Sequence, residues 1–323
     1  MEQFSYSVET ANNQNKNHTF FELSTIWLGL HKEKIKESTY EKYTYLLQKH
    51  IYPVMGEFTL NSLNSAIVNR QLSVIYHKNP DEPLSYSMMK SIIFLVKAIF
   101  KYGCKLHYMG EIAIDFDISK KNHKITIIDF AEQEILIDYI LKEYTSNNLG
   151  IFIALFTGAR LGEICALQRK DVDFKNGILH ITKTVQRLKQ VNKNSINKSK
   201  LIVTLPKSNE SYRDIPLPDS LVKYMKLCEI YDLHENLYIL GQRATPYEPR
   251  TLQYGFSSIL KKCDLPHYNF HSLRHTFATK CIRLGFDVKT LSEILGHSSV
   301  NFTMSQYVHS DMEHKKAQMH LLG

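Results

Sequence analysis

The chain of 323 residues has little cysteine and no long hydrophobic run. Its scattered cysteines form no C-x-x-C pair, which argues against a disulfide framework and a cysteine zinc site. They are Cys104, Cys165, Cys228, Cys263 and Cys281. The apolar runs, such as residues 151–155, are far too short to cross a bilayer. The N-terminus also lacks the basic start and apolar core of a secretory signal. We therefore expect a cytoplasmic protein with reduced thiols.

Acidic residues are fewer than basic ones, with 32 Asp and Glu against 40 Lys and Arg, so the formal net charge is +8. A basic excess favours a polyanionic partner such as DNA. The excess is concentrated between residues 183 and 200, a segment without any acid. The alternative interpretation of this segment is a solvated loop. The candidate DNA-binding residues in it are Lys183, Arg187, Lys189, Lys198 and Lys200.

Residues 18–110 are predicted to form a helical domain. Apolar residues recur there at helical spacing in four stretches, which predicts a small bundle. Trp27, Tyr43 and Phe94 are expected in its core. Residues 1–17 are polar and rich in Asn and Gln, and we expect a loosely attached tail.

Residues 111–129 break the helical period and are predicted to be an interdomain linker. Helical patterns return over residues 130–323, interrupted by three strand-like runs. The runs are residues 177–184, 200–207 and 212–218. They predict a small antiparallel sheet in which residues 185–199 form a long hairpin loop. The whole is predicted to be mainly α: a four-helix domain, then a mixed α/β domain that is mostly helical.

Three motifs point to chemistry on a phosphate. TGARLGEICAL contains Arg160, HSLRHTFAT contains His271 and Arg274, and LGHSSVNFTMSQYVH contains His297 and Tyr307. A tyrosine hydroxyl, with a pKa near ~10, is a poor nucleophile by itself. Fixed arginines and histidines around a phosphate can activate it through charge and proton transfer. The motifs therefore indicate an enzyme that attacks a DNA phosphodiester with tyrosine.

The ordered set of motifs resembles the active site of the tyrosine recombinase, or phage integrase, family. The resemblance extends from about residue 20 to the C-terminus, and the four-helix pattern is similar to the family's core DNA-binding domain. It implies a catalytic domain of the tyrosine recombinase type over residues 130–323. The implied catalytic residues are Arg160, Lys207, His271, Arg274, His297 and Tyr307. Glu163 is expected to support Arg160.

The resemblance also implies the role of each residue. Tyr307 attacks the phosphorus, Arg160 and Arg274 clamp its oxygens, and His297 bonds the phosphate from the far side. His271 accepts a proton, whereas the nearby His275 is more simply interpreted as structural support.

Lys207 would protonate the leaving 5′ oxygen. Lys198 and Lys200 remain alternatives for this role, because one sequence does not fix the register of a hairpin. Ser208 follows Lys207 where the family usually has threonine.

The implied function is site-specific recombination through a 3′-phosphotyrosyl intermediate, for integration and excision of a mobile element. It implies double-stranded DNA with specific core sites as partner, a homotetramer on that DNA, and an accessory excision factor. No metal or other cofactor is implied. The alternatives are an Xer-like chromosome or plasmid resolvase, a type IB topoisomerase-like enzyme, and a catalytically inactive DNA-binding regulator.

Overall fold

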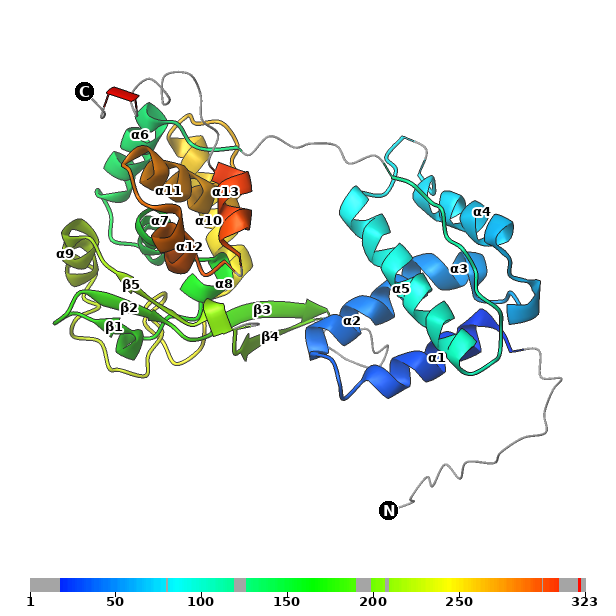
Figure 1. Ribbon diagram of the computed structural model, residues 1–323. Helices are drawn as coiled ribbons and strands as arrows, with labels where there is room; N and C mark the ends of the chain where they lie inside the picture. Colours follow the sequence, from blue (N-terminus) through cyan, green and yellow to red (C-terminus); the bar gives the residue numbers. More distant parts are fainter. Residues whose placement is uncertain are drawn as a thin grey trace, which may run out of the picture. The chain divides into compact units, whose positions relative to one another are not determined.

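The protein is described by a computed structural model, which covers residues 18–79, 81–118, 126–189, 199–206, 209–297, 299–307 and 319–320. The chain forms two compact units: the first comprises residues 1–122 with residues 189–198, and the second comprises residues 123–188 and 199–323 (Figure 1). Each unit has its own hydrophobic core. Among the helices in these ranges, none combines the length and the apolar character that a membrane crossing requires.

The first unit is built from four helical segments, as predicted. Thr19 and Glu22 begin the first with a capping box, in which each side chain accepts a hydrogen bond from the other residue's backbone N–H. The second segment contains a π-helical turn, η1. The elements are α1 (Phe20–His31), α2 (Glu37–Leu46), η1 (Leu47–Ile51), α3 (Tyr52–Met55), η2 (Leu60–Ser62), α4 (Ser65–Tyr76) and α5 (Tyr86–Lys105).

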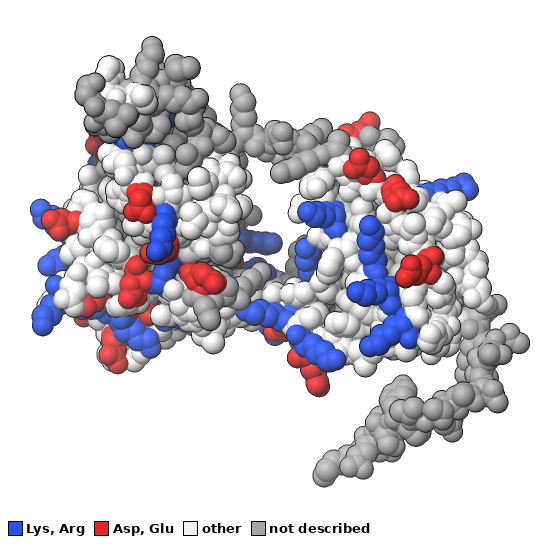
Figure 2. Space-filling model, viewed as in Figure 1, with Lys and Arg blue, Asp and Glu red and all other residues white. Residues whose placement is uncertain are grey.

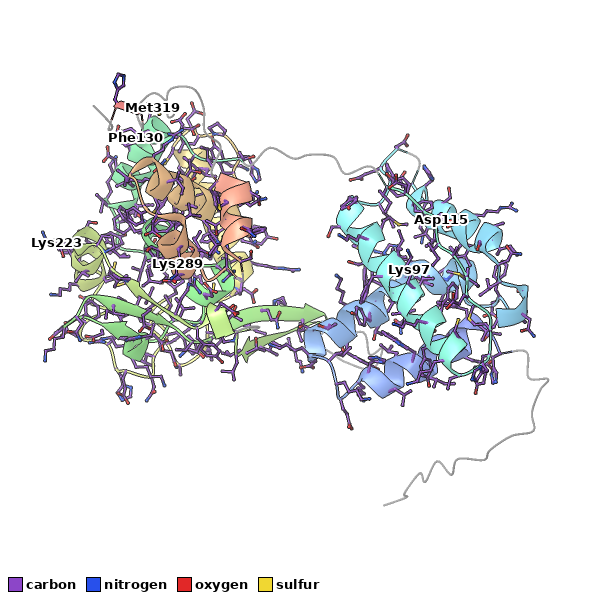
Figure 3. The ribbon with its side chains drawn as sticks, in the orientation of Figure 1. Lys97, Asp115, Phe130, Lys223, Lys289 and Met319 are labelled. Carbon is purple, nitrogen blue, oxygen red and sulfur yellow. The ribbon has the colours of Figure 1, made fainter. Side chains whose placement is uncertain are left out.

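Helix α5 presents a basic face to solvent. Trp27 is buried in the core of this unit and the half-buried Tyr43 packs against it, but the prediction for Phe94 was wrong because its side chain is 58% exposed. Phe94 shares its face with lysines at helical spacing. The exposed face consists of Lys90, Phe94, Lys97 and Lys101. Figure 2 shows basic side chains gathered over this helix, and Figure 3 labels Lys97 on it.

The segment predicted as a linker is attached to a core at each end. Ile114 is buried in the first core, and Phe116 packs against it. Ile128 is buried in the second core, and its backbone N–H donates to Thr276 Oγ1 at 3.0 Å. Both ends of the linker predicted over residues 111–129 thus pack on a core. The local sequence pattern did not reveal that the apolar residues of this segment pack against the two cores.

The second unit is mostly helical, and most of its helices lie on one side of its strands (Figure 1). Its helices are α6 (Phe130–Ile140), α7 (Ser146–Thr157), α8 (Leu161–Ile164), α9 (Asp219–Leu227), α10 (Pro249–Lys262), α11 (His271–Arg283), α12 (Val288–Leu295) and α13 (Val300–Tyr307), with short 3-10 turns η3 (Arg169–Asp171) and η4 (Asn209–Ser211).

The strands form two small sheets. Strands β1 (Val172–Asp173), β2 (Ile178–Ile181) and β5 (Arg213–Pro216) make an antiparallel sheet in the order β1–β2–β5. Strands β3 (Thr184–Lys189) and β4 (Ser199–Thr204) pair separately. The hairpin loop predicted over residues 185–199 was therefore wrong at its start. Val185 and Leu188 are buried, and their packing keeps this part of the chain in a strand.

Helix α7 carries the chain through the second core toward the candidate site. Ile151 and Ile153 are fully buried in it, and it packs on α11. Gly158 ends the helix in the left-handed conformation, with φ +62°. An added Cβ there would lie 2.5 Å from Cδ1 of Phe277 and 2.8 Å from Cδ2 of Leu295. Glycine is therefore required both by the backbone conformation and by the space around it.

Replacing Gly158 with alanine should destabilise the protein more than replacing Gly177, which also has a positive φ but an open surrounding, with its nearest atom at 3.9 Å. Both substitutions incur the left-handed backbone penalty of roughly 1–2 kcal/mol. Gly158→Ala should add about 1–3 kcal/mol for overpacking. Urea unfolding of the two variants measures the difference, and equal losses would contradict the packing argument.

Candidate active site

Arg160 begins α8, two residues after the turn at Gly158. Its backbone N–H and its Nη1 donate to the two carboxylate oxygens of Glu163, each at 2.8 Å. Its Nη2 donates to the carbonyl of Gly296 at 2.7 Å. The side chain is still 37% exposed. Arg160 is thus held along one edge by Glu163 and Gly296, and part of its side chain stays exposed.

Arg213 shares the same carboxylate from the opposite side, and sequence reasoning missed it. Its Nη2 lies 2.7 Å from Oε2 of Glu163, Nη1 donates to Oε1 at 3.1 Å, and Nε donates to the carbonyl of Ile294 at 2.6 Å. Burial by itself would raise the pKa of the Glu163 carboxyl, but the hydrogen bonds and charges of Arg213 and Arg160 outweigh it and lower that pKa. Glu163 is therefore an anion held between two arginines.

Arg274 lies beside Arg160 because both bind the end of α12. The Arg274 side chain is buried, and it donates from Nη1 to the carbonyl of Gly158 and from Nη2 to that of Leu295, each at 2.8 Å. Arg160 binds the next carbonyl, that of Gly296. The C-terminal carbonyls of a helix carry partial negative charge and attract cations. This end of α12 thus gathers two guanidinium groups that the sequence separates by more than a hundred residues.

The two predicted histidines of the site are held neutral. Desolvation of the ring, helped by the charges of His275, Arg274 and Arg160, lowers the pKa of His271 to about 4, although part of the residue remains exposed to solvent. Burial and the surrounding arginines lower the pKa of His297 to about 3. The Nδ1 of His297 lies 2.7 Å from Oγ1 of Thr303. A neutral ring that accepts the threonine proton at Nδ1 carries its own proton on Nε2, where it can be donated to a phosphate oxygen.

Tyr307, at the end of α13, lies among these groups. The structure places its hydroxyl 2.8 Å from Nδ1 of His275, and its ring is parallel to that of His297 at a centroid distance of 6.4 Å. Burial raises the pKa of Tyr307, although the charges of Arg274 and Arg160 oppose the rise. The contact with His275 was not predicted. The spacing of His271 and His275 by one helical turn was the available signal, since both then lie on one face of α11.

This arrangement suits a phosphate with a tyrosine hydroxyl as the attacking group. Two planar guanidinium groups match the oxygens of a phosphate in geometry and charge. Neutral histidines can exchange protons with oxygen atoms near them. Within the ranges that the structure describes, no group of three or more His, Cys, Asp or Glu side chains is arranged to hold a metal ion.

The next predicted residues are four lysines. Lys207 and Lys198, and the side chain of Lys189, are outside the described residues. Lys200 lies in β4.

The two other candidate DNA-binding residues have acidic partners within the protein. The Nζ of Lys183 lies 2.9 Å from Oδ2 of Asp171 and donates a hydrogen bond to Oε1 of Gln168 at 2.7 Å. Arg187 pairs with Glu248. The basic segment contains no acid, so these partners come from elsewhere in the chain.

Family models match both units. The phage integrase family matches residues 126–314, and the phage integrase N-terminal SAM-like domain matches residues 19–71. The "tyrosine recombinase XerC-like" protein of Caldanaerobacter subterraneus subsp. tengcongensis is 26% identical over 76% of this chain and 68% of its own length. The ICEBs1 integrase of Bacillus subtilis is 24% identical over 90% of this chain and 79% of its own length. The transposase of transposon Tn916 from Enterococcus faecalis is 26% identical over 61% of this chain, which spans about half (51%) of that relative.

Solved structures share the fold. The Tn1549 transposon integrase in complex with transposon right end DNA superimposes with a TM-score of 0.75 at 22% identity, over 94% of this chain and 99% of that one. A lambda integrase tetramer bound to a Holliday junction gives a TM-score of 0.66 at 15% identity, over 92% of this chain and 80% of that one.

Replacing Arg213 with methionine should cost about 3–5 kcal/mol of stability, because it leaves the buried carboxylate of Glu163 with one cation in place of two. The matched control is Arg187→Met, which breaks the more exposed pair with Glu248 and should cost about 0–1 kcal/mol. Urea unfolding at neutral pH compares the two variants. A loss no larger for Arg213→Met than for Arg187→Met would contradict the importance of the shared carboxylate.

Proposed function

This chain belongs to the phage integrase family of tyrosine recombinases, and we propose that it cleaves and rejoins DNA at specific sites to integrate and excise a mobile element. The relatives named for transposons and for an integrative element support the mobile-element assignment.

One observation carries the proposal. Arg160 and Arg274 bind adjacent carbonyls at the end of α12, and Tyr307 lies close enough for both charges to act on its hydroxyl. Such a pocket stabilises negative charge on a phosphate while it holds the nucleophile beside it.

The proposed reaction is a transesterification. The oxygen of Tyr307 forms a bond to phosphorus as the bond to the 5′ oxygen breaks, which leaves a 3′-phosphotyrosyl link. Arg160, Arg274 and the Nε2 proton of His297 would stabilise the charge of the transition state. Lys207 would protonate the departing 5′ oxygen. The arginines thus provide the positive charge that two Mg²⁺ ions provide in many nucleases, and no cofactor enters the proposal.

We further propose double-stranded DNA with specific core sites as the partner, four copies of the chain acting together on it, an accessory excision factor and a cytoplasmic location. The exposed lysines on α5 provide a surface for phosphate contacts by the first unit. Lys189, Lys198 and Lys200, from the basic segment of residues 183–200, are also proposed to contact DNA. Lys183 and Arg187 would do so while also paired with acids.

An Xer-like resolvase is the second candidate, because one relative is named XerC-like. Two assays distinguish the candidates. One measures integration of a DNA circle that carries an attachment site, and the other measures resolution of a DNA that carries a repeated site. The match of residues 19–71 to the N-terminal domain of phage integrases favours a recombinase over a topoisomerase.

Replacing Tyr307 with phenylalanine should abolish covalent attachment to a nicked suicide substrate and leave DNA affinity within about twofold, because only the hydroxyl is removed and the basic surface stays. A denaturing gel measures the adduct in EDTA, and a gel shift measures binding. A covalent adduct in the phenylalanine variant would show that the nucleophile is another residue. No adduct with the unchanged protein would support an inactive DNA-binding regulator.

Lys207→Ala should slow cleavage by about 10²-fold or more on a natural substrate, as expected for a lost general acid. It should slow cleavage much less on a 5′-bridging phosphorothioate, because a sulfur leaving group needs little protonation. Single-turnover rates on the two substrates give the ratio. Equal slowing on both would remove Lys207 from this role and direct attention to Lys198 and Lys200.

A further inference from the structure

We propose that His275 accepts the phenolic proton of Tyr307 as the tyrosine attacks, an inference that rests on the proposed recombinase function. His275 follows the predicted pair His271 and Arg274 on α11 and was expected only to support the fold.

The geometry carries the proposal. The Nδ1 of His275 lies 2.8 Å from the hydroxyl oxygen of Tyr307, which is the hydrogen-bond partner of that hydroxyl in the described part of the chain. His271 instead presents an edge-on contact to the ring of His275, with centroids 4.6 Å apart. A general base must lie within hydrogen-bond reach of the proton that it removes. His275 meets this condition, and His271 does not meet it here.

The surroundings keep His275 ready to accept a proton. Burial, together with the neighbouring charge of Arg274, lowers the pKa of His275, so the ring is neutral at neutral pH. In the tautomer protonated at Nε2, Nδ1 accepts the hydrogen bond from Tyr307.

The charged and titratable groups around His275 are few. Helix α13 contributes Tyr307, and α11 contributes His271 and Arg274. Helix α7, which packs on α11, carries no titratable side chain. The titratable side chains of α12, Lys289 and Glu293, are exposed.

The step balances in atoms and charge. The bond between hydrogen and the Tyr307 oxygen breaks as the oxygen forms its bond to phosphorus, and the proton moves to Nδ1 of His275, which becomes an imidazolium. The 5′ oxygen leaves with the electron pair of its bond to phosphorus and takes a proton from Lys207. In rejoining, a 5′ hydroxyl attacks the phosphotyrosine and gives its proton to the neutral Lys207, while His275 returns its proton to the departing phenolate.

Two substitutions separate a proton acceptor from a group that only positions the tyrosine. His275→Asn keeps a hydrogen-bonding atom near the place of Nδ1 but has no accessible basicity, whereas His275→Leu removes the hydrogen bond as well. Both should slow adduct formation on a suicide substrate by about 10²-fold at pH 7. The matched control is His267→Asn, which changes an exposed histidine outside the site and should react at the original rate.

The pH profile is a readout that a purely structural role would not change. Each unit of pH up to the pKa of Tyr307 raises the phenolate fraction about tenfold. The ratio of the original rate of adduct formation to that of His275→Asn should therefore fall toward one by pH ~9.5. A defect that stays constant with pH, or an asparagine variant that reacts at the original rate, would overturn the proposal. So would a shrinking defect in His271→Asn but not in His275→Asn.

A measurement without DNA keeps the inference separate from the proposed function. Nitrogen NMR of the His275 ring should show an unprotonated Nδ1 whose resonance moves in Tyr307→Phe. A proton on Nδ1 would overturn the role of His275 even if the enzyme recombines DNA. Absence of any adduct from the unchanged protein would instead overturn the proposed function, while the NMR result still decides the contact.

Discussion

The last carbonyls of α12 hold the arginines of this site, and the rest of the arrangement depends on them. Arg213, Arg274 and Arg160 bind the consecutive carbonyls of residues 294, 295 and 296. Three cations so close together repel one another, and the helix end alone does not compensate for them. Glu163 supplies the missing negative charge between Arg160 and Arg213 and leaves one edge of Arg160 open. The site therefore keeps an excess of positive charge, which a bound phosphate can neutralise.

The same positive charge determines the state of the histidines. His271 and His297 lie beside the arginines with lowered pKa values, so both rings stay neutral at neutral pH. A bound phosphate would oppose these shifts, because its negative charge favours the imidazolium form. The arginines thus provide the permanent charge of the site, while the histidines provide hydrogen bonds and proton transfer. This division suits a reaction in which a proton must leave the tyrosine and later return.

The two units contribute different parts of a DNA-handling protein. The second unit contains the whole described site, on α8, α11, α12 and α13 with β5 behind them. The first unit contributes the basic face of α5, where Phe94 is exposed among lysines. An exposed aromatic residue between cations can pack on sugars or bases while its neighbours bind phosphates.

The helical character of both units and a small sheet were determined by the sequence alone, because periodicity is a local signal. The ordered motifs named Arg160, Arg274, His297 and Tyr307, which the structure brings together. Arg213 was missed because its importance comes from a carboxylate on α8 and a carbonyl on α12, both far away in the chain. Phe94 was misplaced because an apolar residue at helical spacing does not show which faces a helix buries. The contact of His275 with Tyr307 was likewise decided only by the tertiary structure, since the packing of α13 on α11 chooses which histidine meets the hydroxyl.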